Sequence, residues 1–123
     1  MQRTTRAMTG ALLSALMACP GHAGLADVVS ASADCAASVC RFVVTVRHGD
    51  EGWNHYANAW EVVAPDGAVL ATRVLQHPHV GEQPFTRELG GVKVPATLTS
   101  VRIRARDSVH GFGGREVVVP LGR

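Results

Sequence analysis

A chain of 123 residues is long enough for one compact domain. It carries 12 lysines and arginines against 10 aspartates and glutamates, a formal net charge of +2. Arg3 and Arg6 lie in an N-terminal stretch without acidic residues, so residues 24–123 hold 10 basic and 10 acidic groups, a balance that favours neither nucleic acid nor an anionic membrane surface as a partner.

The first 23 residues have the pattern of a secretory signal peptide. A basic start is followed by the apolar run 7–18, which is too short to cross a membrane, and small residues precede a cut after Ala23. A cut after Ala26 is an alternative. We therefore expect a signal peptide at 1–23, a single domain at 24–123, and a periplasmic or secreted protein.

The same stretch also allows a lipid anchor. The segment Leu16-Met17-Ala18-Cys19 resembles a bacterial lipobox, in which the cysteine is lipidated and becomes the first residue. Met17 and the following Pro20 depart from the usual pattern. In this alternative Cys19 would attach the protein to a membrane.

Two cysteines remain beyond the signal peptide. Cys35 and Cys40 form an even pair separated by four residues, which in an oxidising compartment predicts a disulfide. A zinc site would need two further ligands of this kind, and no other cysteine follows residue 23. Methionine is also absent from residues 24–123, which argues against Cu(I) and blue-copper sites.

Short β-rich runs separated by Gly, Pro, Asp and Asn predict an all-β domain. The turn signal Pro65-Asp66-Gly67 predicts a hairpin, and Gly90-Gly91 is expected to end a strand. In chain order, the expected strands span residues 25–33, 39–48, 56–64, 68–75, 85–89, 100–106 and 115–121.

Alternation along these runs predicts which side chains face the core. In 56–64, Tyr56, Trp60 and Val62 share one face and Glu61 lies on the other. In three other strands the inward residues are Cys40, Phe42, Val44 and Val46, then Val101, Ile103 and Ala105, then Val117, Val119 and Leu121. Outward arginines at 102, 104 and 106 can form cross-strand ion pairs with Glu61 and Glu116.

About seven such strands, with an inward tryptophan on the third, resemble an immunoglobulin-like or fibronectin-III-like sandwich. The stretch from Val94-Pro95 through Val101-Arg102-Ile103-Arg104-Ala105 is similar to the end of a fibronectin-type domain. The resemblance implies an antiparallel β-sandwich, a fold that carries many functions.

Three segments, residues 52–62, 75–87 and 110–117, resemble a group of uncharacterised small exported bacterial proteins. This resemblance implies export, and it brings no activity or site residue with it.

Sandwich connectivity places the loops 48–55, 76–84 and 107–114 at one end of the domain. They hold every histidine of residues 24–123, namely His48, His55, His77, His79 and His110, accompanied by Asp50, Glu51, Glu82 and Asp107. We expect these histidines to gather there and to bind a divalent metal ion. The alternative is that they are ordinary loop histidines bonded to carboxylates and backbone.

The segment His77-Pro78-His79 is the most suggestive part of this set. Alternate residues of an extended segment share a face with Cα atoms about 6.8 Å apart, and proline favours extended geometry in the residue before it. A third imidazole from His48, His55 or His110 would complete a set suited to Zn²⁺ or Cu²⁺.

The function expected from the sequence is a non-enzymatic binding module. Trp53 and Phe112 in the loops, together with Asp50 and Glu82, are candidate contacts to a ligand or partner. One alternative is a metal-free structural domain that contacts an envelope protein or a glycan through the same loops. A small metal-dependent hydrolase with Glu82 as its base is a further alternative, although no catalytic residue is assigned.

Overall fold

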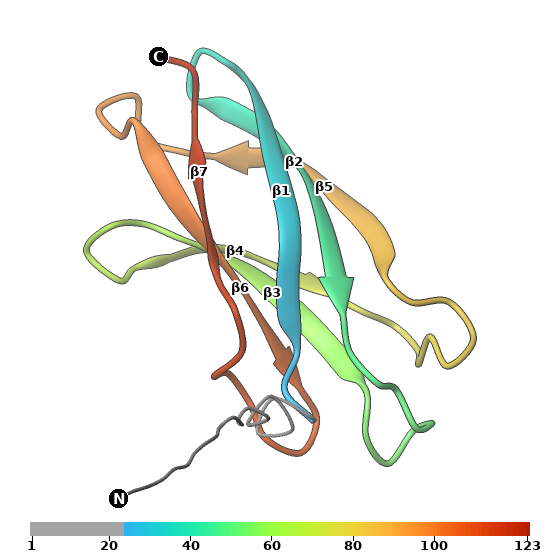
Figure 1. Ribbon diagram of the computed structural model, residues 1–123. Coiled ribbons are helices and arrows are strands. Elements are labelled where there is room, and N and C mark those ends of the chain that lie inside the picture. Colours follow the sequence, from blue (N-terminus) through green and yellow to red (C-terminus); the bar gives the residue numbers. More distant parts are fainter. Residues whose placement is uncertain (1–23) are drawn as a thin grey trace, which may run out of the picture.

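The structure is a computed structural model that describes residues 24–123, so the expected signal peptide and Cys19 lie outside the described residues. Two antiparallel sheets pack face to face as a β-sandwich (Figure 1). The strands are β1 (Asp27–Ala36), β2 (Val39–Arg47), β3 (Ala57–Val63), β4 (Val69–Val74), β5 (Phe85–Lys93), β6 (Ser100–Asp107) and β7 (Val117–Pro120).

One sheet has the order β1-β2-β5 and the other the order β4-β3-β6-β7. The expected seven-stranded all-β sandwich is therefore confirmed, and its assignment to the immunoglobulin or fibronectin-III type stays a prediction. Across residues 24–123 no helix is long and apolar enough to span a membrane.

The core lies between the sheets and follows the predicted alternation. From β2, the side chains of Cys40, Phe42, Val44 and Val46 are buried, as are Val101, Ile103 and Ala105 from β6. His48 continues the buried face of β2 beyond the last residue of the strand, and Asp107 continues that of β6. Two polar side chains thus enter the interior at the ends of apolar strand faces.

Strand β3 differs from the prediction in one respect. A register shift against β6 between Ala57 and Ala59 turns Ala57 into the core, where Tyr56 was expected. Tyr56 instead packs edge-on against Trp53, with ring centroids 5.6 Å apart. Glu61 faces away from the core as predicted, but it is almost fully buried and forms an ion pair with Arg104 at 2.8 Å.

Strand β5 runs through Gly90 and Gly91, so the expected strand end at this pair is wrong. The pairing with β2 shifts register between Cys40 and Phe42, opposite the glycines. Gly91 has φ +67°, a conformation that glycine adopts without steric cost, so the irregularity is accommodated within the strand.

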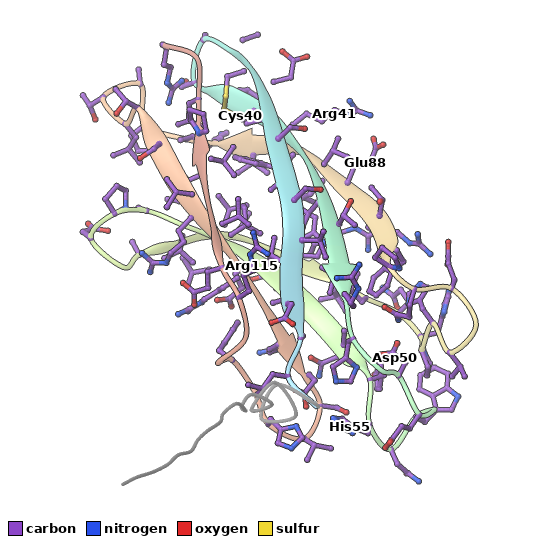
Figure 2. The ribbon with its side chains drawn as sticks, in the orientation of Figure 1. Cys40, Arg41, Asp50, His55, Glu88 and Arg115 are labelled. Atoms are coloured by element: carbon purple, nitrogen blue, oxygen red, sulfur yellow. A yellow bond between two sulfur atoms is a disulfide. The ribbon has the colours of Figure 1, made fainter. Side chains whose placement is uncertain are left out.

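The disulfide Cys35–Cys40 is confirmed. It joins two residues that are directly paired across β1 and β2 near the turn of their hairpin. Figure 2 shows Cys40 towards one end of the sandwich and Asp50 and His55 towards the other. The cross-link and the candidate site are therefore at opposite ends of the domain.

Candidate metal centre

Three side chains that could hold a metal ion meet at one end of the sandwich. His48 follows β2, His55 precedes β3, and Asp107 is the last residue of β6. One potential ligand atom from each lies within 4.8 Å of the other two. Antiparallel pairing causes this meeting, because it places the end of β6 beside the start of β3. We call these three residues the triad.

Asp50 fixes the orientation of the His48 ring. Its Oδ1 lies 2.5 Å from Nδ1 of His48 and also accepts a hydrogen bond from the backbone N–H of Ala57 at 3.0 Å. Its Oδ2 accepts from the backbone N–H of His79 at 2.7 Å. A carboxylate in this position draws the imidazole proton onto Nδ1 and leaves the lone pair on Nε2. Histidines that bind metals usually have such a partner on the other ring nitrogen.

His55 reaches the same point from the start of β3. Its Nδ1 lies 3.3 Å from Oε1 of Glu51, while its Nε2 lies 3.3 Å from Oδ1 of Asp107. Burial lowers the pKa of His55. The Gly24 carbonyl, Glu51 and Asp107 together raise this pKa by more than burial lowers it, so the net shift is upward. The surroundings of this ring therefore favour a positive charge.

Asp107 is an ionised carboxylate, and one of its two oxygens accepts no hydrogen bond from the described residues. Its Oδ1 accepts hydrogen bonds from the backbone N–H groups of Val109 at 2.8 Å and His110 at 2.6 Å. Burial raises the pKa of Asp107, but these two N–H donors and the rings of His110 and His48 lower it below the ordinary value. Within residues 24–123 no donor forms a hydrogen bond with Oδ2, although that atom is buried.

The carbonyl oxygen of Gly24 is a fourth electron-rich atom at this point. It lies 3.1 Å from Nε2 of His48 and 3.2 Å from Nε2 of His55. Oδ2 of Asp107 lies 3.9 Å from Nε2 of His48. In a tetrahedral zinc site with bonds of about 2.0–2.1 Å, neighbouring ligand atoms stand about 3.3 Å apart. The two spacings to the Gly24 carbonyl are close to this value and are also those of ring N–H hydrogen bonds, while the spacing between Asp107 and His48 is longer.

The charge balance of this point is unusual. With both rings neutral and their protons on Nδ1, the two Nε2 atoms, the Gly24 carbonyl and the Asp107 carboxylate present only lone pairs to one another. Such a group needs either a proton on at least one Nε2, donated to the Gly24 carbonyl, or a cation between the lone pairs. A pocket of about 290 Å³, lined in part by Gly24, His48 and His55, connects it with solvent.

His110 lies beside the triad. Its ring centroid is 4.9 Å from that of His55, and its Nδ1 is 3.2 Å from Oδ1 of Asp107. The side chain is 42% exposed, so it covers the solvent side of the group. In this structure it is a neighbour of the three converging ligands.

His77 and His79 form a separate pair, so the expected single cluster of five histidines is not formed. Their ring centroids are 4.7 Å apart. The ring of His79 stacks on Phe85 at 4.0 Å, and its Nε2 accepts a hydrogen bond from Arg87 at 2.7 Å. Burial, followed by the charges of Arg87 and His77, lowers the pKa of His79. Contacts with β5 therefore hold this ring away from the triad.

The other predicted contact residues lie around the two groups. Trp53 is 67% exposed in the loop before β3. The guanidinium carbon of Arg104 lies over the ring of Phe112, 4.2 Å from the centroid of that ring. Glu82 forms an ion pair with Arg87 at 3.6 Å, beside His79. The structure therefore gives no support for Glu82 as a base at the triad.

Asp107 and Gly24 are the two contributors that sequence reasoning did not assign as ligands. Asp107 had a usable signal, since it extends the alternation of Val101, Ile103 and Ala105 by one step and so falls on the inward face. Gly24 had none, because its contribution is a backbone carbonyl.

Comparisons with known proteins give one informative similarity. A protein of Halomicrobium mukohataei named "Putative lipoprotein" is 39% identical over 98 residues, which are 80% of this chain and 47% of the relative. The chain thus spans about half the length of that relative. No family model matches the chain, and no solved structure matches it.

Proposed function

We propose that this protein is an exported binding module that holds one divalent metal ion, Zn²⁺ or Cu²⁺, through Nε2 of His48, Nε2 of His55 and the carboxylate of Asp107. The observation that carries the proposal is the buried Oδ2 of Asp107, which has no hydrogen-bond donor among the described residues and lies 3.9 Å from Nε2 of His48. Imidazole and carboxylate groups suit both ions.

The arrangement behind the triad orients both rings for a metal. Asp50 holds Nδ1 of His48 and Glu51 lies near Nδ1 of His55, so both rings present Nε2 to the same point. Protons are the competing source of positive charge, and a proton on His55, whose pKa is raised, would balance the single charge of Asp107. One divalent ion would replace that proton and would satisfy Nε2 of His48, Nε2 of His55 and Oδ2 of Asp107 together.

Export is supported by three separate features. Residues 1–23 have the signal-peptide pattern, the chain forms a disulfide, and a relative carries the name of a lipoprotein. We therefore propose a location in the periplasm or outside the cell, with a lipid anchor through Cys19 as the alternative.

The test is a metal titration of the processed, chelator-stripped protein by calorimetry. We expect one-to-one binding of Zn²⁺ or Cu²⁺, weakened at least about tenfold in His55→Gln and in Asp107→Asn, since even loss of an outer partner costs that much. His77→Gln is the matched control, because it removes an exposed histidine outside the triad. Circular dichroism would verify that each variant is folded. No binding, or binding that both variants retain in full, would contradict the proposal.

A second candidate is a metal-free contact with an envelope protein or a glycan. The exposed indole of Trp53 favours it, since a large aromatic ring in a loop can stack on a sugar or insert into a partner. Binding to a panel of envelope glycans that Trp53→Ala abolishes, with no metal bound, would support this candidate instead.

A further inference from the structure

Gly24, the first described residue, lies inside the candidate metal centre rather than beside it. Its carbonyl oxygen is within 3.2 Å of Nε2 of both His48 and His55. The described chain starts at the same end of the sandwich as the loop that follows β6 (Figure 1). The backbone nitrogen of Gly24 belongs to the same residue and is separated from that carbonyl carbon by Cα alone.

The residues that precede β1 are built into the domain. Ala26 is 1% exposed and belongs to the core. Gly24 has φ +93°, and a Cβ there would lie 2.7 Å from Cε1 of His110. A cut after Ala26 would remove these packed residues, whereas a cut after Ala23 leaves all of them in place.

We propose that signal peptidase cuts after Ala23 and that the α-amine of Gly24 then becomes a ligand of the metal, so that export processing completes the site. This inference rests on the function proposed above. Hydrolysis of the Ala23–Gly24 bond consumes one water, whose hydroxyl forms the carboxyl group of Ala23 while its proton goes to the Gly24 nitrogen. Near neutral pH the new carboxyl group gives up its proton and the amine takes one up, and on binding the ion the amine releases that proton to solvent.

The chemistry of the two forms differs at one atom. In the precursor the Gly24 nitrogen is an amide, whose electron pair is delocalised into the carbonyl and is not available to Zn²⁺. In the processed chain it is an amine with an ordinary pKa of about 8, which offers a lone pair near neutral pH. An α-amine and the carbonyl oxygen of the same residue close a five-membered ring when they bind one ion. The processed protein therefore binds metal more tightly than its precursor.

The chain allows a clean test because Lys93 is its single lysine. In a Lys93→Arg variant the processed protein has one primary amine, the α-amine, and acetylation forms a stable amide at that group alone. Full-length protein would be exported from a bacterial host, and mass spectrometry would locate its N-terminus. Zn²⁺ affinity would then be measured for the acetylated and unmodified forms of this variant, with thermal unfolding as the check on folding.

We expect the mature chain to start at Gly24 and acetylation to weaken Zn²⁺ binding at least about tenfold, the lower end of the cost of losing even an outer-shell partner. A chain that starts at another residue, or equal affinities of the two forms, would overturn the inference and leave the triad proposal standing. If neither form binds Zn²⁺ or Cu²⁺, both proposals are wrong.

Discussion

Nδ1 of His48 lies 2.5 Å from Oδ1 of Asp50, and both side chains are buried. Asp50 is also the link between the two histidine groups, because its Oδ2 accepts the backbone N–H of His79 at 2.7 Å. One carboxylate thus orients the ring of a proposed ligand and anchors the loop that carries the second histidine pair.

This relationship predicts that Asp50→Asn weakens metal binding without removing a ligand. Asparagine has a single acceptor oxygen, so its NH2 group must face either Nδ1 of His48 or the backbone N–H of His79. The negative charge that favours a proton on Nδ1 is lost in both cases, and we expect a loss of affinity of about 10- to 100-fold. Calorimetric titration of Zn²⁺ would measure it. Asp66→Asn is the matched control, since Asp66 lies in the exposed β3–β4 turn, where its Oδ1 accepts a hydrogen bond from Ala68. An affinity of Asp50→Asn equal to that of the control would contradict the prediction.

Gly24→Ala is predicted to destabilise the folded state and to disturb the metal centre. The new Cβ would lie 2.7 Å from Cε1 of His110, so this ring, which packs against His55, would have to move. Overpacking of this kind costs about 1 kcal/mol or more. Urea unfolding would show the loss, with Gly81→Ala as the control, because a Cβ there meets no atom within 4 Å. A free energy of unfolding equal to that of the control would refute the structural role given to Gly24.

Much of the fold could be predicted because its strands are amphipathic in a simple way. In β2 and β6 each alternate residue is buried, and the pattern is visible without any tertiary information. The position of Tyr56 and the end of β5 could not be predicted in the same way. Both depend on register shifts between paired strands, which a single strand's sequence does not contain.

The candidate site was predictable in its location and not in its membership. Strand order alone placed the loops with His48, His55 and His110 at one end. His79 was expected to join them, but its ring is held by stacking on Phe85 and by Arg87, two contacts that spacing along the chain does not encode. The Gly24 carbonyl could not be anticipated, since every residue type has the same group.

The disulfide is predicted to stabilise the fold and to leave the metal centre unaffected. The loop that it closes is short, because Cys40 follows Cys35 by only five residues in the sequence. Chain-entropy arguments for such a loop give about 2 kcal/mol of stabilisation. The double variant Cys35→Ala/Cys40→Ala should lose that amount in urea unfolding, whereas its Zn²⁺ affinity should match the wild type, because distant sites act independently. A large change in affinity would show that the two ends of the sandwich are coupled.

The lowered pKa of His79 predicts a stability that falls on mild acidification. Burial and the neighbouring charges of Arg87 and His77 oppose its protonation in the folded state, while Glu82 and Asp50 favour it more weakly. Unfolded His79 protonates near its ordinary pKa of 6.5. Between that value and the lower folded pKa, the unfolded chain binds more protons, so the contribution of His79 is complete above pH 6.5 and is lost as the pH falls below it.

His79→Gln keeps a hydrogen-bond acceptor for Arg87 and removes the titration. The difference in unfolding free energy between wild type and this variant should therefore shrink as the pH is lowered from about 7.5 to 5.5, by at most about 1.4 kcal/mol per pH unit, the limit for one proton. His77→Gln is the control, because His77 is an exposed neighbour of His79. This variant should keep most of the wild-type change of unfolding free energy with pH. If the difference between wild type and His79→Gln stays constant over this range, then the ring of His79 is not held neutral by its contacts with Phe85 and Arg87.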